Sequence, residues 1–87
     1  MIHARSDYNE RIQDSAMLIG IDEPVFLVRA KDVAAPLTVR AWARHNLAIG
    51  GDAAMSIAAE HHADLMEKWQ QQNLNQVKIA DAPDGAI

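Results

Sequence analysis

The sequence predicts a mainly α-helical fold: a small three-helix domain with one short strand, assembled as a homo-oligomer. Three observations lead to this prediction. Helix-favouring residues dominate the 87-residue chain outside positions 25–29. Gly20 and the pair Gly50 and Gly51 stand where helices are expected to end. The central segment is apolar on nearly every side, and so short a chain has little with which to cover it.

The first helix is expected over residues 7–18. Asp7 can cap its first turn, and Tyr8 and Ile12 fall on the same side of a helical wheel, which gives the segment an apolar face. Gly20 follows as a natural C-terminal stop.

A strand is expected at about 25–30, because Val25 begins a run of four β-favouring residues directly after Pro24. A competing interpretation keeps this stretch helical, with Asp22 as its N-cap. A lone strand leaves half of its backbone polar groups unpaired. Its partner is therefore expected to be the tail near 76–79 or the same strand of a second subunit.

The second helix is expected over 33–49, with Asp32 as its cap. Its large apolar side chains point in several directions: Leu37, Trp42 and Leu47. Only Arg40 and Arg44, one turn apart, form a clear polar stripe. A helix with so many apolar sides belongs at the centre of a fold or in a subunit interface.

The third helix is expected over 52–72, capped by Asp52. Its apolar stripe has 3-4-3-4 spacing: Met55, Ala58, His62, Leu65 and Trp69. This spacing suits antiparallel packing against another helix of the chain or against another copy. The tail, 76–87, contains proline and glycine and is expected to be flexible.

Self-association is expected because a domain of this size buries only about 60–65% of its unfolded surface. The chain has no cysteine for a disulfide to supply the missing stability. The oligomer interface or the core is expected to contain eight residues: Phe26, Leu37, Trp42, Leu47, Met55, His62, Leu65 and Trp69.

The composition also narrows the partners and the compartment. A net charge of −4 argues against general nucleic-acid binding, which favours basic proteins. No apolar run approaches the roughly 20 residues of a membrane span. We therefore expect a cytoplasmic protein that binds neither nucleic acid in general nor a membrane.

Arginines are the candidate binding residues. Arg40 and Arg44 form a row one helical turn apart, and Arg29 lies nearby in the sequence. Such a row can hold a phosphate or a carboxylate, and a symmetric oligomer would double it. The alternative is a solvated stripe paired with Glu23, Glu60 or Glu67.

Metal binding and catalysis have a weaker basis. His61 and Asp64 are three residues apart and lie near one helical face, but a zinc site needs three or four ligands. Further ligands would have to come from another histidine or a second subunit. No serine sits in a nucleophile elbow, and no glycine-rich phosphate loop is present. We therefore predict no enzyme activity, no metal and no cofactor.

The segment DEPVFLVRAKDVAAPLTVRAWA, from Asp22 to Ala43, resembles short bacteriophage and prophage proteins of unknown function. Those proteins carry a similar DEPVF-L-RA-D segment, then a helix with V-R-x-W-A, a glycine-rich stop and a helix ending near a tryptophan. The resemblance covers roughly residues 20–70. It implies an accessory protein in the host cytoplasm that binds a host protein or sequesters a host signal molecule.

Three hypotheses about function follow. The first is a non-enzymatic phage or prophage accessory protein that binds a host protein. The second is an oligomer that sequesters a nucleotide-like anion between subunits through Arg40 and Arg44. The third is a metal-binding module or enzyme that uses His61 and Asp64.

Overall fold

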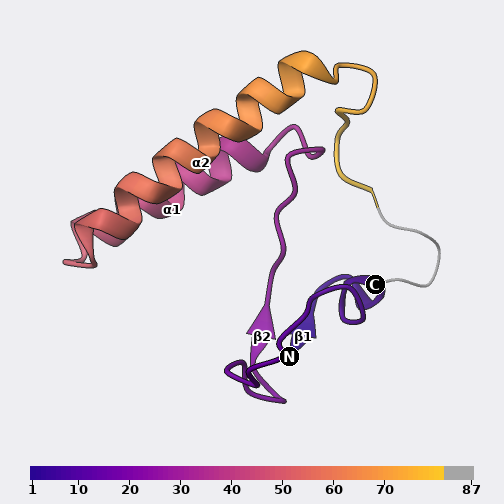
Figure 1. Cartoon of the computed structure of the whole chain (residues 1–87), viewed down its shortest axis with the longest axis vertical. Coiled ribbons are helices and arrows are strands. Elements are labelled where there is room, and N and C mark those ends of the chain that lie inside the picture. The colour runs from indigo at the N-terminus through magenta and orange to yellow at the C-terminus, as the bar shows by residue number, and fades with distance from the viewer. Residues whose placement is uncertain (82–87) are drawn as a thin grey trace. The chain divides into compact units, whose positions relative to one another are not determined.

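A computed structural model describes residues 1–81 of the chain, which form two compact units. One unit contains Met1–Leu27 and Asp81, and the other contains Val28–Ala80. Figure 1 labels, in chain order, β1 (Ile2–His3), β2 (Pro24–Val25), α1 (Ala35–Ala48) and α2 (Ala53–Gln72). The part of the expected flexible tail that falls on 82–87 lies outside the described residues.

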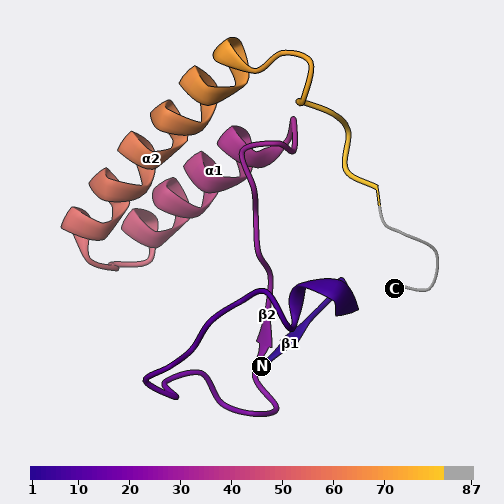
Figure 2. The same cartoon turned by 45° about the vertical axis from the view of Figure 1, so that its right-hand side comes forward.

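The second unit is an antiparallel helical hairpin. Helix α1 spans Ala35–Ala48 and helix α2 spans Ala53–Gln72, and the two lie side by side (Figures 1 and 2). The helices expected over 33–49 and 52–72 are therefore confirmed. Asp32 does not cap α1, because the N-cap residue is Ala34; the Asp32 carboxylate instead accepts a hydrogen bond from the Ala34 N–H at 2.9 Å.

The loop between the helices is short and tightly held. Gly50 has φ +83°, in the left-handed region that favours glycine. The Gly51 N–H donates to the Asn46 carbonyl at 2.7 Å. Asp52 then caps α2, as expected, because its carboxylate accepts a hydrogen bond from the Met55 N–H at 3.1 Å.

Small side chains fill the seam between the helices. Ala35, Ala43 and Ala63 are almost fully buried, at 0–1% exposure. On α2 the seam repeats at 3-4-3-4 spacing through Ser56, Ala59, Ala63, Met66 and Gln70, all of them buried or half-buried. Short side chains let two helices approach closely, so this hairpin has little apolar volume in its interior.

The chain on either side of the hairpin is tied to it by hydrogen bonds. The Gln70 amide on α2 donates to the Ala30 and Asp32 carbonyls at 2.9 and 3.0 Å. Lys78 forms a parallel bridge with Asp32, through its N–H to the Lys31 carbonyl at 3.1 Å and its carbonyl to the Val33 N–H at 3.0 Å. The tail thus pairs near residue 32.

The first unit contains a two-stranded parallel sheet. Strand β1 (Ile2–His3) pairs with strand β2 (Pro24–Val25), Ile2 with Pro24 and His3 with Val25. The strand expected over 25–30 is therefore shorter and begins one residue earlier. The tail near 76–79 was the wrong partner, because β2 pairs with the residues at the start of the sequence; pairing with a second subunit stays a prediction.

The helix expected over 7–18 is absent, so residues 1–81 contain two α-helices and not three. Only a 3-10 turn, η1 (Ser6–Tyr8), forms there. The Asp14 carboxylate accepts from the Leu18 and Ile19 N–H groups at 3.0 and 2.9 Å, and Met17 has φ +55°. A side chain that takes backbone donors in this way competes with a helix.

Histidine 3 is the centre of the first unit. Its side chain is buried, lies edge-on to Tyr8 at 5.0 Å between ring centroids, and stacks on Phe26 at 4.9 Å. The Arg5 guanidinium lies over the Tyr8 ring, with its Cζ 4.4 Å from the ring centroid, and it forms an ion pair with Asp7 at 2.7 Å.

In residues 1–81, no helix has the length and apolar character to cross a membrane.

Candidate functional site: the two faces of the helical hairpin

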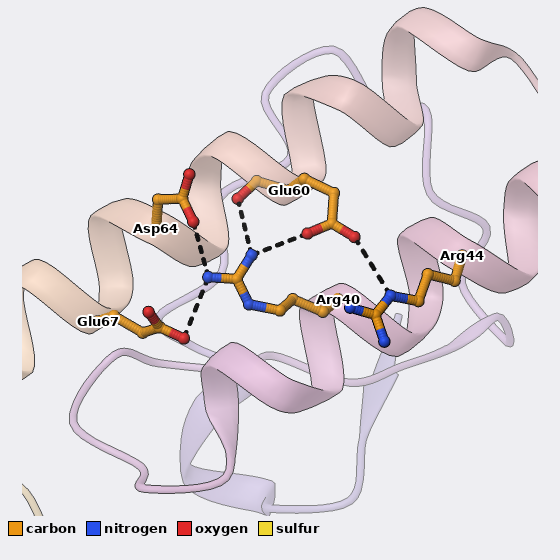
Figure 3. Close-up of polar contacts among 5 residues, drawn as sticks. All are labelled: Arg40, Arg44, Glu60, Asp64 and Glu67. Carbon is orange, nitrogen blue, oxygen red and sulfur yellow. Dashed lines mark hydrogen bonds and ion pairs between the residues drawn. The ribbon is translucent and has the colours of Figure 1, made fainter.

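One side of the hairpin is built around Arg40, whose guanidinium reaches across from α1 to three carboxylates of α2 (Figure 3). Its Nη1 donates to Glu60 Oε2 at 2.8 Å, and its Nη2 lies 2.7 Å from Asp64 Oδ1 and 3.0 Å from Glu67 Oε1. The Arg40 side chain is only 18% exposed, against 75% for Arg44.

Arg44 joins the same side more loosely. Its Nε lies 3.6 Å from Glu60 Oε1, and its side chain is 75% exposed. We name this side the charged face and define it by five residues: Arg40, Arg44, Glu60, Asp64 and Glu67. Two guanidinium groups meet three carboxylates here, so the face carries an excess of negative charge.

Hydrogen bonds to Asp64, Glu60 and Glu67, in that order of effect, raise the pKa of Arg40 well above its ordinary value. The guanidinium therefore stays charged throughout the accessible pH range. Its donors already serve carboxylates of the same chain. An incoming phosphate or carboxylate would have to displace them, so the geometry favours the solvated, paired stripe for Arg40 over a ligand site.

The opposite side of the hairpin is apolar. Residues two apart in an α-helix lie about 160° apart around its axis. Because Arg40 and Asp64 meet on one side, Trp42 and His62 must lie on the other. We name this side the apolar face and define it by Trp42, Ile49, Met55, His62, Leu65 and Trp69.

Most of the apolar face is open to solvent. Ile49, Leu65 and Met55 are 69%, 61% and 56% exposed, and Trp42 is 49% exposed. No Asp, Glu, Lys or Arg of α1 or α2 lies on this face, because these residues gather on the charged face or beside it. Large exposed apolar patches of this kind mark interaction surfaces.

An open groove of about 340 Å³ lies on the charged side, near the loop. Leu47 and Ile57 give it apolar walls, and Arg44, Glu60 and His61 give it polar ones. Arg44 is the candidate arginine that borders this groove.

The eight residues expected in the interface or core are not core residues of this chain. Trp69 is half-buried and the other seven are exposed. Trp42, Met55, His62, Leu65 and Trp69 lie together on the apolar face, Leu47 lines the groove, and Leu37 lies on the outer side of α1. Phe26 belongs to the first unit, where it stacks on His3.

The remaining candidates do not converge. The ion pairs of the charged face join Arg40 and Arg44 to α2 and do not include Arg29, which precedes α1. Asp64 is engaged by Arg40, while His61 lines the groove. Across residues 1–81, no group of three or more His, Cys, Asp or Glu side chains is placed to hold a metal ion.

Sequence reasoning missed two features of this site. The sequence indicated that the arginine stripe could pair with Glu60 or Glu67, but Asp64 was assigned to a metal site although it extends the same acidic row. Ile49 is not among the eight residues expected in the interface or core, and it completes the apolar face. Both signals were present in the helical periodicity.

Comparisons with known proteins add no relative to this description. No family model matches the chain, and neither a curated protein nor a solved structure matches it. The candidate site therefore rests on the geometry of this chain alone.

Proposed function

We propose that this protein is a non-enzymatic protein-binding module whose helical hairpin presents the apolar face to a protein partner. A single observation supports the proposal. Most of the large apolar side chains of the hairpin lie outside its seam, where Ala35, Ala43, Ala63 and Met66 are buried. Burial of large apolar side chains is the main stabilising contribution to protein association. In this chain such side chains lie together on the apolar face, which contains no Asp, Glu, Lys or Arg.

The resemblance to short bacteriophage and prophage proteins gives this proposal a context. An accessory protein of that kind would act in the host cytoplasm on a host protein. The exposed Trp42 and the half-buried Trp69 suit this role, since tryptophan is enriched among the residues that dominate binding energy at protein interfaces.

Photo-cross-linking from inside cells tests the proposal. A photoreactive amino acid replaces Leu65 on the apolar face, or Gln71 as a matched control; both positions are exposed on α2, and their spacing of six residues places them about 120° apart around the helix. We expect protein adducts from position 65 and few from position 71. Absence of adducts from both positions, or equal yields from both, would contradict a binding role for this face.

One observation supports a second candidate, the sequestration of a nucleotide-like anion. The groove places the exposed Arg44 and His61 beside the apolar side chains Leu47 and Ile57, a combination that suits an anion with a flat ring. Glu60 in the same groove opposes it. The thermal midpoint should then rise with linear or cyclic nucleotides, and Arg44→Ala should remove the rise. No shift with any nucleotide would eliminate this candidate.

A further inference from the structure

Helix α2 carries two adjacent seams, and α1 covers only one of them. The covered seam runs through Ser56, Ala59, Ala63, Met66 and Gln70. The second, through Met55, Ala58, His62, Leu65 and Trp69, has the same 3-4-3-4 spacing one residue earlier and remains uncovered except for part of Trp69. A helix with two such seams is typical of a four-helix bundle, where each helix packs against two neighbours.

We propose that a second copy of this chain covers the apolar face, so that two hairpins form an antiparallel four-helix bundle. This inference rests on the proposed protein-binding role and names the occupant of the surface. Three properties of the face favour a second copy over another protein: its side-chain sizes are self-complementary, it contains no Asp, Glu, Lys or Arg, and its area is sufficient.

The sizes match when α2 meets α2 of the second copy in antiparallel register. With a twofold axis between His62 and Leu65, each His62 lies opposite Leu65 of the second copy. The same register places Ala58, the smallest residue of the stripe, opposite Trp69, the largest. A small residue against a large one fills a layer without a void or a clash.

The charges also permit this pairing. A twofold interface brings each surface against itself, so any charge near the axis would face its own copy and repel it. The apolar face avoids this cost because Arg40, Glu60, Asp64 and Glu67 all lie on the charged face. The bundle would therefore keep its ionic groups in water.

The area is sufficient for a specific contact. Side chains of this size, about half exposed, would together remove on the order of 1,000 Å² from water across two copies, near the lower limit for a stable interface. Trp42 and Ile49 extend the surface from α2 onto α1, so both helices of each hairpin take part.

Sedimentation equilibrium from about 1 to 100 μM tests the inference on the full chain. We expect a mass of twice 9.6 kDa for the wild type and for Gln71→Glu, which adds the same charge about 120° away around α2, and at least a tenfold weaker association for Leu65→Glu. A wild type of 9.6 kDa at every concentration, or a Leu65→Glu variant that associates equally well, would overturn it.

Disulfide trapping tests the register without relying on a disruptive charge. Because the chain has no cysteine, introduced thiols are its only thiols. Mixing Ala58→Cys with Trp69→Cys under mild oxidation should give a cross-linked dimer. Ala58→Cys alone should not cross-link, since the two copies of position 58 would lie about 16 Å apart along the helices. Equal cross-linking by Ala58→Cys alone, or none in the mixture, would overturn the antiparallel register.

Amide hydrogen exchange of the wild type separates failure of this inference from failure of the proposed function. A monomer with rapid exchange throughout α1 and α2 would refute the second copy while leaving the hairpin in need of another protein. A monomer with slow exchange would refute the second copy alone, and the photo-cross-linking yield from position 65 would then decide the protein-binding role.

Discussion

Arg40 Nη2 on α1 and Asp64 Oδ1 on α2 lie 2.7 Å apart, and this contact marks one side of the hairpin on both helices. Because a helix has one angular direction for each position, fixing Arg40 and Asp64 on the same side also fixes Trp42 and His62 on the other. The ion pair and the apolar face are thus two results of one helix rotation.

Replacing Arg40 should destabilise the hairpin. Arg40→Ala leaves Glu60, Asp64 and Glu67 close together without a cation, so we expect the thermal midpoint to fall by several degrees. Arg44→Ala is the control and should have little effect, because Arg44 is 75% exposed and makes one contact at 3.6 Å. Circular dichroism melts at low salt give the thermal midpoints of both variants. Equal midpoints for Arg40→Ala and Arg44→Ala would show that the ion pairs of Arg40 do not stabilise the hairpin.

Enlarging a seam residue should be costly. Ala63 is fully buried, so Ala63→Leu must push the helices apart, at about 1–3 kcal/mol of unfolding free energy. Ala41→Leu adds the same side chain to an exposed position of α1 and should change stability by less than about 0.5 kcal/mol. Urea unfolding gives both values, and a stabilised Ala63→Leu variant would mean that the seam is not closely packed.

The two loop glycines should differ in their tolerance of side chains. A Cβ at Gly51 would collide with the side-chain amide of Asn46 and would lie 2.7 Å from the backbone carbonyl oxygen of the same residue. Gly51→Ala should therefore lower the free energy of unfolding by about 1–3 kcal/mol. Gly50→Asn should cost less, because asparagine accepts the left-handed φ of +83° and nothing lies within 4 Å of a Cβ there. The same urea experiment ranks them, and the reverse order would refute this description of the loop.

Acid should weaken the first unit through Asp7. The two hydrogen bonds from Arg5 lower the pKa of Asp7 below its ordinary 3.8. A carboxyl with a lowered folded-state pKa stabilises the fold above its unfolded value, and this contribution is lost as pH falls through the folded value. Carboxyl NMR titration should show the lowered pKa, and Arg5→Ala should return it toward 3.8. An unchanged titration in Arg5→Ala would exclude Arg5 as the cause.

Periodicity and capping residues were enough to predict the hairpin. Asp52 and the glycines before it correctly separated two helices, whose ends differ from the prediction by at most two residues. The same rules failed for 7–18, where Asp14 bonds to backbone N–H groups and Met17 takes a positive φ. Such competition between side chain and backbone depends on local geometry that a helical wheel does not represent.

The sequence also did not predict which of two neighbouring stripes of α2 packs against α1. Hydrophobicity favoured the stripe with Leu65 and Trp69, whereas α1 packs on the stripe with Ala63 and Ser56. Two terms absent from a hydrophobicity ranking favour the observed rotation: close approach through alanines, and the bridge from Arg40 to Asp64. The strand at Pro24–Val25 was assigned the wrong partner because long-range pairing leaves no local signal.

The seam between α1 and α2 couples the apolar face to the charged face. Because the helices pack closely, a partner that moved them apart at the apolar face would also lengthen the contacts of Arg40 with Glu60 and Asp64 on the charged face. Occupancy of one surface would thereby become a change in ionic contacts on the other, transmitted through the thickness of a single helix pair.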